Sequence, residues 1–190
     1  MSTRARIGGR ARGPRVYHVR ADHPLAAAVL AELAIEYSAR YGDTAGSIHR
    51  RMRERPPAEF TAPHGDLLVL VEHGEPVAGG GFRRVDGTTA EMKRVWTERA
   101  QRRRGLATRV LAELESEMIR LGYRQVLAAT GDQQPEARGL YTAAGYTEAG
   151  AATAGRRGPR FRFEKALHIP EHAGLVRAAT VLRPGLRRSR

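Results

Sequence analysis

Residues 95–107 read Val-Trp-Thr-Glu-Arg-Ala-Gln-Arg-Arg-Arg-Gly-Leu-Ala, and this stretch decides the fold. It has the form of a strand end, a tight polar turn and a helix that starts on Gly105. Free N–H groups of the first helical turn converge at such a point, and the helix dipole adds partial positive charge. Gly105 and the small Ala107 let a ligand approach the backbone closely, and residues 102–104 are all arginine. The unit therefore predicts a site for a phosphate or pyrophosphate.

Two familiar nucleotide-binding motifs do not match this unit. A P-loop requires G-x-x-x-x-G-K-[ST], and a Rossmann fingerprint requires G-x-G-x-x-G near the first strand, and both patterns are missing. From spacing alone, an arginine-rich surface loop that caps a helix explains the stretch about as well as an anion site does.

The chain upstream of the unit contains three expected strands, at 67–71, 76–85 and 89–97. Their connections contain the dipeptides His73-Gly74 and Asp86-Gly87, which are typical of hairpin turns. Three consecutive glycines at 79–81 weaken the middle strand and predict a bulge or a close backbone approach.

The segment before these strands has the pattern of one strand and two helices. Residues 16–20 are expected to form a strand, and Asp22 is expected to cap a helix that runs to about Arg40 and stops at Gly42. A second, more polar helix is expected at 44–55. In this helix-rich segment, Tyr37, Tyr41, Asp43 and Glu54 could line a pocket.

Downstream of the unit, apolar residues at helical spacing predict a helix over 105–121, which Gly122 terminates. A strand at 125–129, a helix at 135–144, a strand start at 146–148 and a final strand at 160–165 follow. The expected element order is thus β-α-α-β-β-β-α-β-α-β-β.

The formal charge of +13 lies mostly at the two ends of the chain. Residues 1–15 and 177–190 carry ten arginines and no acid, which leaves +3 for residues 16–176. We therefore expect a basic disordered tail at 1–15, one domain at 16–168, and a basic tail at 169–190 in which 174–182 are compatible with a short helix. Of the 33 basic residues only Lys93 and Lys165 are lysines, a bias that suggests a GC-rich genome more than selection for phosphate contacts.

Several classes of protein do not match this composition. The chain has no cysteine, which excludes disulfides, thiolate metal sites and a cysteine nucleophile, and which is compatible with a cytoplasmic protein. No apolar run approaches the length of a membrane span, and the N-terminus lacks the apolar core of a secretory signal. The seven histidines show no metal-binding spacing, so no metal is expected.

Three motifs in order then resemble one family. Arg102-x-x-Gly105-x-Ala107 resembles the [Q/R]-x-x-G-x-[G/A] acetyl-CoA pyrophosphate loop of the GNAT family of N-acetyltransferases. Residues 90–95, Ala-Glu-Met-Lys-Arg-Val, resemble the family's fourth strand. Residues 130–146 resemble its last helix and retain the pattern x-x-A-x-x-L-Y-x-x-x-G-[FY]. The resemblance covers residues 89–148 closely and 16–88 by element order.

The resemblance implies both a fold and an activity. The implied fold is an α/β structure with a mixed, mostly antiparallel central sheet of six to seven strands, flanked by helices, whose fourth and fifth strands splay apart to admit acetyl-CoA. The implied activity is transfer of the acetyl group of acetyl-CoA to a primary amine, by direct attack in a ternary complex. No covalent acetyl-enzyme is required, which agrees with the absence of cysteine.

The resemblance also implies a set of cofactor contacts. The backbones of Val95 and Thr97 would pair with the pantetheine arm, and the Val95 N–H would stabilise the oxyanion, although ordinary ladder pairing remains the alternative for both. Gln134 stands where the family often has an asparagine that contacts the cofactor. The full set expected to contact acetyl-CoA is Val95, Trp96, Thr97, Arg102, Arg103, Arg104, Gly105, Leu106, Ala107, Thr108, Gln134 and Tyr141.

Two residues are implied as catalytic. Tyr141 matches the family's tyrosine that donates a proton to the departing thiolate, and a phenol remains protonated at neutral pH, as this role demands; the alternative is a core tyrosine. Glu91 is the candidate general base, if regular alternation places Glu91, Lys93, Val95 and Thr97 on one face of the strand. The alternative is a solvent-facing carboxylate, and a bulge in this strand would change the alternation.

The acceptor stays open, and small-molecule amines, antibiotics, polyamines and protein amino groups are all compatible with the sequence. Transfer from a different acyl-CoA is an alternative within the enzymes. Outside them, the chain could be a silent acetyl-CoA-binding regulator or a basic nucleic-acid-binding protein on the same fold. Homodimers are common in the family.

Overall fold

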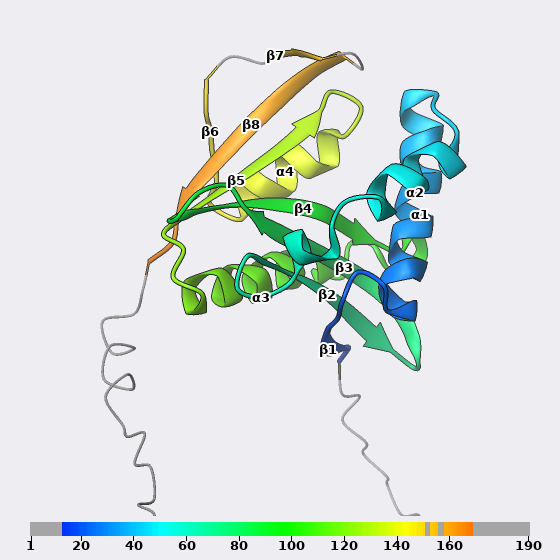
Figure 1. Ribbon diagram of the computed structural model, residues 1–190. Coiled ribbons are helices and arrows are strands. Elements are labelled where there is room, and N and C mark those ends of the chain that lie inside the picture. The colour runs from blue at the N-terminus through cyan, green and yellow to red at the C-terminus, as the bar shows by residue number, and fades with distance from the viewer. Residues whose placement is uncertain (1–12, 151–152, 156–157, 169–190) are drawn as a thin grey trace, which may run out of the picture.

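A computed structural model describes residues 13–150, 153–155 and 158–168 of the chain. One mixed sheet forms its centre, with helices on both faces (Figure 1). The main path through the sheet is β1-β2-β3-β4-β5-β8-β6, and the short β7 pairs with β8. This confirms the expected α/β fold, and the predictions for residues 1–12 and 169–190 lie outside the described residues.

The strands agree with the predicted order, with one addition. β7 was not expected, and β1 begins at Arg15, one residue before its predicted start. The strands are β1 (Arg15–His18), β2 (Gly65–Glu72), β3 (Glu75–Arg84), β4 (Thr89–Thr97), β5 (Gln125–Gly131), β6 (Thr147–Glu148), β7 (Thr153–Gly155) and β8 (Gly158–Ala166).

The helices also follow the predicted order. They are α1 (Pro24–Tyr41), α2 (Ala45–Arg53), α3 (Leu106–Arg120) and α4 (Pro135–Ala143), with short 3₁₀ turns η1 (Pro57–Phe60) and η2 (Arg99–Gln101). Gly42 ends α1 in the left-handed conformation, as expected. The predicted cap was wrong: His23 is the N-cap of α1 and its side chain accepts from the Leu25 N–H, whereas Asp22 pairs with Arg20.

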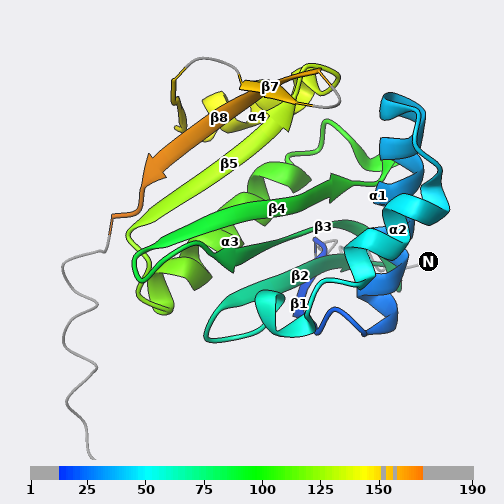
Figure 2. The same cartoon turned by 45° about the horizontal axis from the view of Figure 1, so that its top comes forward.

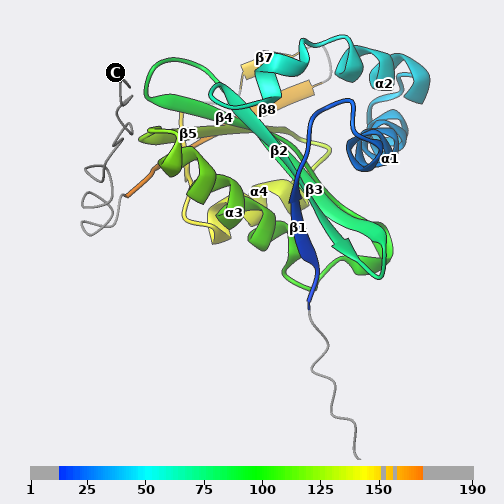
Figure 3. The same cartoon turned by 60° about the horizontal axis from the view of Figure 1, so that its bottom comes forward.

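The core lies on both faces of the sheet. α3 and α4 cover one face, and α1 and α2 lie on the other (Figure 3). Alternate residues of β2 pack on opposite faces of the sheet. Leu68 and Leu70 belong to the large cluster beneath α3. Val69 packs with Val29 and Leu33 of α1. Burial on both faces explains why β2 reads as a nearly continuous apolar run.

Strands β4 and β5 are parallel but share only a short ladder. Residues 89–91 pair with residues 125–127, and beyond that point the two strands separate (Figure 2). β4 continues antiparallel to β3, and β5 continues antiparallel to β8. The two strands therefore open a gap at their carboxyl ends, in the part of the sheet where the strand–loop–helix unit begins.

A bulge in β4 changes which side chains face each layer. Gly79 pairs with Trp96 and Gly81 pairs with Lys93, so Gly80 opposes two residues of β4. One of them, Arg94, has a φ of 59°, in the left-handed region that non-glycine residues rarely adopt.

The bulge is the alternative that the sequence left open, and it removes the alternation expected of a regular strand. Val95 packs against the cluster beneath α3, whereas Trp96 packs with the α1 residues on the opposite face. Thr97 pairs with Ala78, which belongs to the α3 cluster. Val95 and Thr97 therefore face α3, and Glu91 and Lys93 lie on the α1 side. At the same place α3 packs closely on β3, because Gly80 has no side chain to keep Val110 and Leu114 away.

None of the described helices is long and apolar enough to span a membrane.

Replacing Gly80 by alanine should destabilise the fold. A Cβ there would lie 2.8 Å from Val110 Cγ1 and 3.2 Å from Leu114 Cδ1, so α3 would have to move. We expect Gly80→Ala to lower the free energy of unfolding by about 1–3 kcal/mol, measured by urea denaturation. The control is Gly46→Ala in α2, where a Cβ meets nothing within 4 Å and where we expect a gain of roughly 0.5–1 kcal/mol. Equal stability of the two variants would contradict the close packing of α3 on β3.

Candidate functional site

The N-terminus of α3 has the geometry of an anion site. Gly105 is the N-cap with a φ of 75°, and no side chain caps the helix. A Cβ at Gly105 would meet nothing within 4 Å, so the space above it is open. Leu106 is buried and anchors the first turn in the core, whereas Thr108 is exposed. The first-turn amides therefore point away from the core with no side-chain partner.

The three arginines of the loop differ in their contacts. Arg102 pairs with Glu36 of α1 at 2.9 Å and also donates to the Thr97 carbonyl. Arg104 pairs with Glu72 at the end of β2 at 2.8 Å. Arg103 is exposed and has a φ of 64°. Because exposed ion pairs contribute only about 0–1 kcal/mol each, an anion can recruit Arg102 and Arg104 at low cost.

At the end of β4, beside the gap, one polar side chain has no hydrogen-bond partner among the described residues. The Thr97 hydroxyl oxygen is buried and has no hydrogen-bond partner within the part of the chain that the structure describes. Leaving a buried hydroxyl unpaired is costly. A ligand that enters the gap can bond to this hydroxyl, in addition to the predicted backbone role of Thr97.

Tyr141 of α4 reaches the gap from the α3 side. Its ring packs against Tyr146 and Phe163, and the residue is 5% exposed. Burial raises the pKa of the Tyr141 hydroxyl far above its ordinary value, and the neighbouring Tyr37 and Glu91 raise it further. Tyr37 belongs to α1 and Glu91 to β4, so groups on the α1 side of the sheet influence the Tyr141 hydroxyl. It keeps its proton and can donate it.

Glu91 lies in a row of ion pairs on the α1 side of the sheet. Its carboxylate contacts Lys93 Nζ at 2.5 Å and Arg83 at 3.0 Å, and Arg83 also pairs with Glu59 of η1. Burial acts to raise the pKa of Glu91, but the hydrogen bonds and charges of Lys93 and Arg83 outweigh it, and the pKa falls below its ordinary value. A carboxylate held ionised in this way is a weak base.

Gln134 joins the two sides of the gap. It is the N-cap of α4, and its side-chain oxygen lies 3.1 Å from the Thr130 hydroxyl and 3.3 Å from the Tyr41 hydroxyl. Its side chain also hydrogen-bonds to Tyr37, which acts against the burial that raises the pKa of Tyr37. The structure thus gives Gln134 a clear role in placing α1 beside α4, and its predicted cofactor contact stays a prediction.

Two α1 residues that sequence reasoning missed complete this arrangement. Glu36 bridges Arg40 and Arg102, and Arg40 also contacts Glu136 and the Gln133 carbonyl of the β5–α4 connection. Their i, i+4 spacing was a visible signal of a helix ion pair. The sequence gave no sign that the same pair would link the loops that follow β4 and β5.

The bulge residue Arg94 fixes α2 and η1 to the sheet. Its guanidinium lies 3.9 Å from the centre of the Phe60 ring and donates to the Met52 carbonyl at 2.7 Å. Burial lowers the pKa of Arg94 to about 10. Its other terminal nitrogen, Nη1, is buried without a partner among the described residues. Arg94 thus holds α2 and η1 against the sheet.

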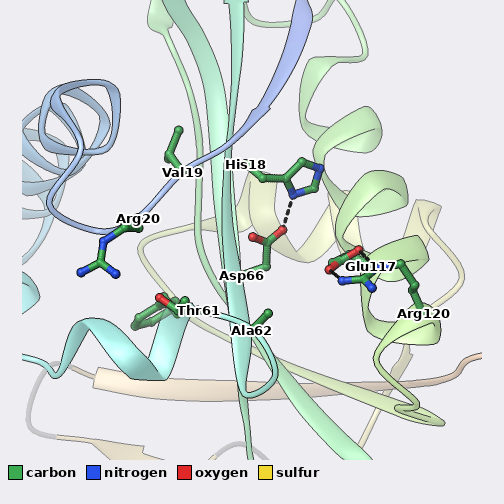
Figure 4. Close-up of a pocket in the computed structure, with 9 residues that line it drawn as sticks. His18, Val19, Arg20, Thr61, Ala62, Asp66, Glu117 and Arg120 are labelled. Carbon is green, nitrogen blue, oxygen red and sulfur yellow. Dashed lines mark hydrogen bonds and ion pairs between the residues drawn. The ribbon is translucent and has the colours of Figure 1, made fainter. Parts of the chain in front are cut away.

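A pocket of about 390 Å³ lies elsewhere, between β1, the η1–β2 connection and α3 (Figure 4). His18 and Asp66 approach to 2.6 Å there, and Glu117 and Arg120 of α3 lie opposite them. Burial raises the pKa of Asp66, and its hydrogen bond with His18 acts against this. No residue predicted to bind or react lines this pocket, so the site at the β4–β5 gap is separate from it.

The described residues include no cluster of three or more histidine, aspartate or glutamate side chains that could hold a metal ion.

Comparison with families of known proteins gives one match. Residues 28–146 match the Acetyltransferase (GNAT) family. This range includes the strand–loop–helix unit, the β4–β5 gap and Tyr141. No curated protein sequence matches the chain significantly.

Several solved structures share the fold. An acetyltransferase from Streptococcus agalactiae superimposes with a TM-score of 0.66 at 14% identity, covering 82% of this chain and 99% of that one. A Salmonella typhimurium protein solved with its cofactor acetyl-CoA gives 0.65 at 17% identity, covering 84% and 96%. An aminoglycoside 6'-N-acetyltransferase complexed with coenzyme A gives 0.65 at 19% identity, covering 82% and 98%. At these identities the likeness shows the fold alone.

The ion pairs of Glu91 should make part of the stability pH-dependent. Since the pKa of Glu91 is lowered in the folded state, its contribution is present above the unfolded-state pKa and is lost as the pH falls through the folded-state pKa. The stability difference between wild type and Glu91→Gln should therefore shrink between about pH 6 and about pH 3, measured by urea unfolding.

The control for this experiment is Glu54→Gln. Glu54 is exposed and lies 3.8 Å from Arg50, so its removal should change stability little at either pH. A wild-type to Glu91→Gln difference that stays constant with pH would show that the Glu91 ion pairs do not stabilise the fold.

Proposed function

Because this chain belongs to the Acetyltransferase (GNAT) family, we propose that it is an N-acetyltransferase that moves the acetyl group of acetyl-CoA to a primary amine. One observation carries the proposal. The uncapped N-terminus of α3 follows β4 and the protonated Tyr141 belongs to α4, which follows β5, so each of the two separating strands leads to one of these groups. The helix end can bind the pyrophosphate of acetyl-CoA. The protonated phenol can donate a proton to the sulfur of its thioester.

The donor is held by main-chain groups and helped by side-chain charge. The pyrophosphate lies on the amides of Arg103 to Ala107 and on Thr108, with Arg102 and Arg104 exchanging their carboxylate partners for phosphate oxygens. The pantetheine arm follows the end of β4, where Thr97 has an unpaired hydroxyl. Neutralisation by arginine and by the α3 dipole is what the two negative phosphates need.

Transfer then needs an unprotonated amine, a stabilised oxyanion and a proton for the thiolate. The amine enters from the α1 side and attacks the thioester carbon directly, so that an N–C bond forms and the C–S bond breaks. The bulge at Arg94 and Val95 interrupts the ladder with β3, which supports a free Val95 N–H as the oxyanion donor. Tyr141 donates its proton to the sulfur and regains one from the nitrogen.

Glu91 acts by charge in this proposal. Its lowered pKa works against the predicted role of general base, because it would hold a proton poorly. Its ionised carboxylate can accept a hydrogen bond from the substrate amine on the acceptor side of the gap, and water carries the released proton away. Two tyrosines of α1 also belong to the acceptor side. Tyr37 is half-buried and influences the pKa of Tyr141, and Tyr41 lies against Gly131.

Loss of the Tyr141 hydroxyl should slow acetyl transfer while acetyl-CoA still binds. With a panel of small amines, polyamines, aminoglycosides and peptides, release of free CoA thiol should identify an acceptor. Tyr141→Phe should then lower kcat by roughly 100- to 10,000-fold.

The matched control is Tyr146→Phe, whose hydroxyl bonds to Glu115 beneath α3 and which should keep near wild-type turnover. Unchanged turnover in Tyr141→Phe would overturn the assignment of Tyr141 as the acid. Absence of thiol release with every amine, in a folded chain that binds acetyl-CoA, would favour the silent regulator.

The backbone at the start of α3 should decide affinity for the donor. Gly105 and Gly122 stand at opposite ends of α3, both with positive φ and open space around a Cβ. Alanine at either should cost about 1–2 kcal/mol of stability through left-handed strain. Only Gly105→Ala should also weaken CoA binding, measured by calorimetry, and equal CoA affinity in the two variants would place the phosphates elsewhere.

A further inference from the structure

The chain contains two lysines, which make similar ion pairs but lie on opposite faces of the sheet. Lys93 pairs with Glu91 at 2.5 Å, and Lys165 of β8 pairs with Glu115 of α3 at 2.7 Å. Their side chains are 29% and 27% exposed. Lys93 lies on the α1 side of the sheet, whereas Lys165 lies with Tyr146 beneath α3. Lys165 thus serves as a comparison for Lys93, because the two have a similar ion pair and a similar exposed fraction but lie on different faces of the sheet.

Lys93 is placed where the acceptor amine is expected. It is the last residue of β4 before the bulge, and its ammonium contacts the carboxylate that we propose accepts a hydrogen bond from the substrate amine. The same carboxylate is close enough to Tyr141 to raise the pKa of its hydroxyl. Lys93 therefore lies where the gap opens, two residues beyond the last β4–β5 pair and beside a carboxylate that also influences Tyr141.

The surroundings of Lys93 favour the reactive form of its amine. Burial lowers the pKa of Lys93, Glu91 acts to raise it, and the positive charges of Arg83 and Arg160 lower it again, leaving it below its ordinary value. These are the charged groups that face the ammonium, from β4, β3 and β8. A larger neutral fraction at neutral pH is what nucleophilic attack by an amine requires.

We propose that Lys93 is a modification site, whose Nζ takes the acetyl group from acetyl-CoA bound to the same chain. The inference rests on the proposed function for its donor. The Nζ lone pair forms an N–C bond to the acetyl carbon and the C–S bond breaks. CoA leaves as the thiol, because the proton that Nζ loses balances the one that the thiolate gains through Tyr141. The product is acetyl-lysine, which no longer pairs as a cation with Glu91.

The test uses the full chain incubated with acetyl-CoA and no added amine. Intact mass should rise by one acetyl group, and peptide mapping should place it on Lys93. Because the gap positions the amine beside the thioester, Lys93 should react at least about tenfold faster than Lys165. The rate should be independent of chain concentration, as a reaction within one chain requires.

Variants and an unfolded sample separate this reaction from chemical acetylation. Lys93→Arg should remove the modification, Lys165→Arg should retain it, and Tyr141→Phe should slow it. Heat-unfolded chain should lose the preference for Lys93. Equal acetylation of both lysines, equal rates in unfolded chain, or a rate that rises with chain concentration would overturn the proposal.

A separate measurement distinguishes failure of this inference from failure of the proposed function. CoA binding by calorimetry and thiol release with the amine panel are followed on the same preparations. If the chain binds acetyl-CoA and acetylates an added amine while Lys93 stays unmodified, the Lys93 proposal fails and the enzyme assignment stands. If the chain does not bind acetyl-CoA, both fail.

Discussion

The separation of β4 from β5 is the constraint on which the site depends. Parallel strands cannot be joined by a tight hairpin, so the chain must cross over between them, and α3 is that crossover. After three residues of shared ladder, each strand follows its own antiparallel partner. The gap that results lies between the end of β4, which leads to the uncapped N-terminus of α3, and the end of β5, which leads to α4 and Tyr141.

Electrostatics then gives the two faces of the gap different chemistry. On the α3 side, burial keeps the Tyr141 hydroxyl protonated, and Tyr37 and Glu91 act in the same direction. On the α1 side, Glu91 stays ionised because Lys93 and Arg83 contact it. One side can thus give a proton and the other can accept a hydrogen bond from an amine, a separation that one open surface in water would not maintain because solvent would screen both groups.

Local sequence patterns predicted most elements because local physics decides them. Glycines at 42 and 105 adopt left-handed conformations that other residues avoid, and apolar spacing places Leu106, Val110 and Leu114 in the core. The errors occurred where two local solutions compete. Asp22 is an acceptable cap, but Arg20 takes its carboxylate and His23 caps α1 instead. Likewise, the sequence left open whether β4 is regular, and only its pairing with the glycines of β3 shows the bulge.

The sequence by itself determined the element order, the open helix end at Gly105, and the resemblance that identifies the family, because each depends on residues close together in the chain. Only the tertiary structure decided which face Val95 and Glu91 occupy, since that depends on a bulge set by a neighbouring strand. It also decided that Glu91 has two cations beside it, that Glu36 and Arg40 join the loops after β4 and β5, and that Lys93 and Lys165 lie on opposite faces. Contacts between residues distant in the chain form only when the sheet brings them together, and no local pattern records them.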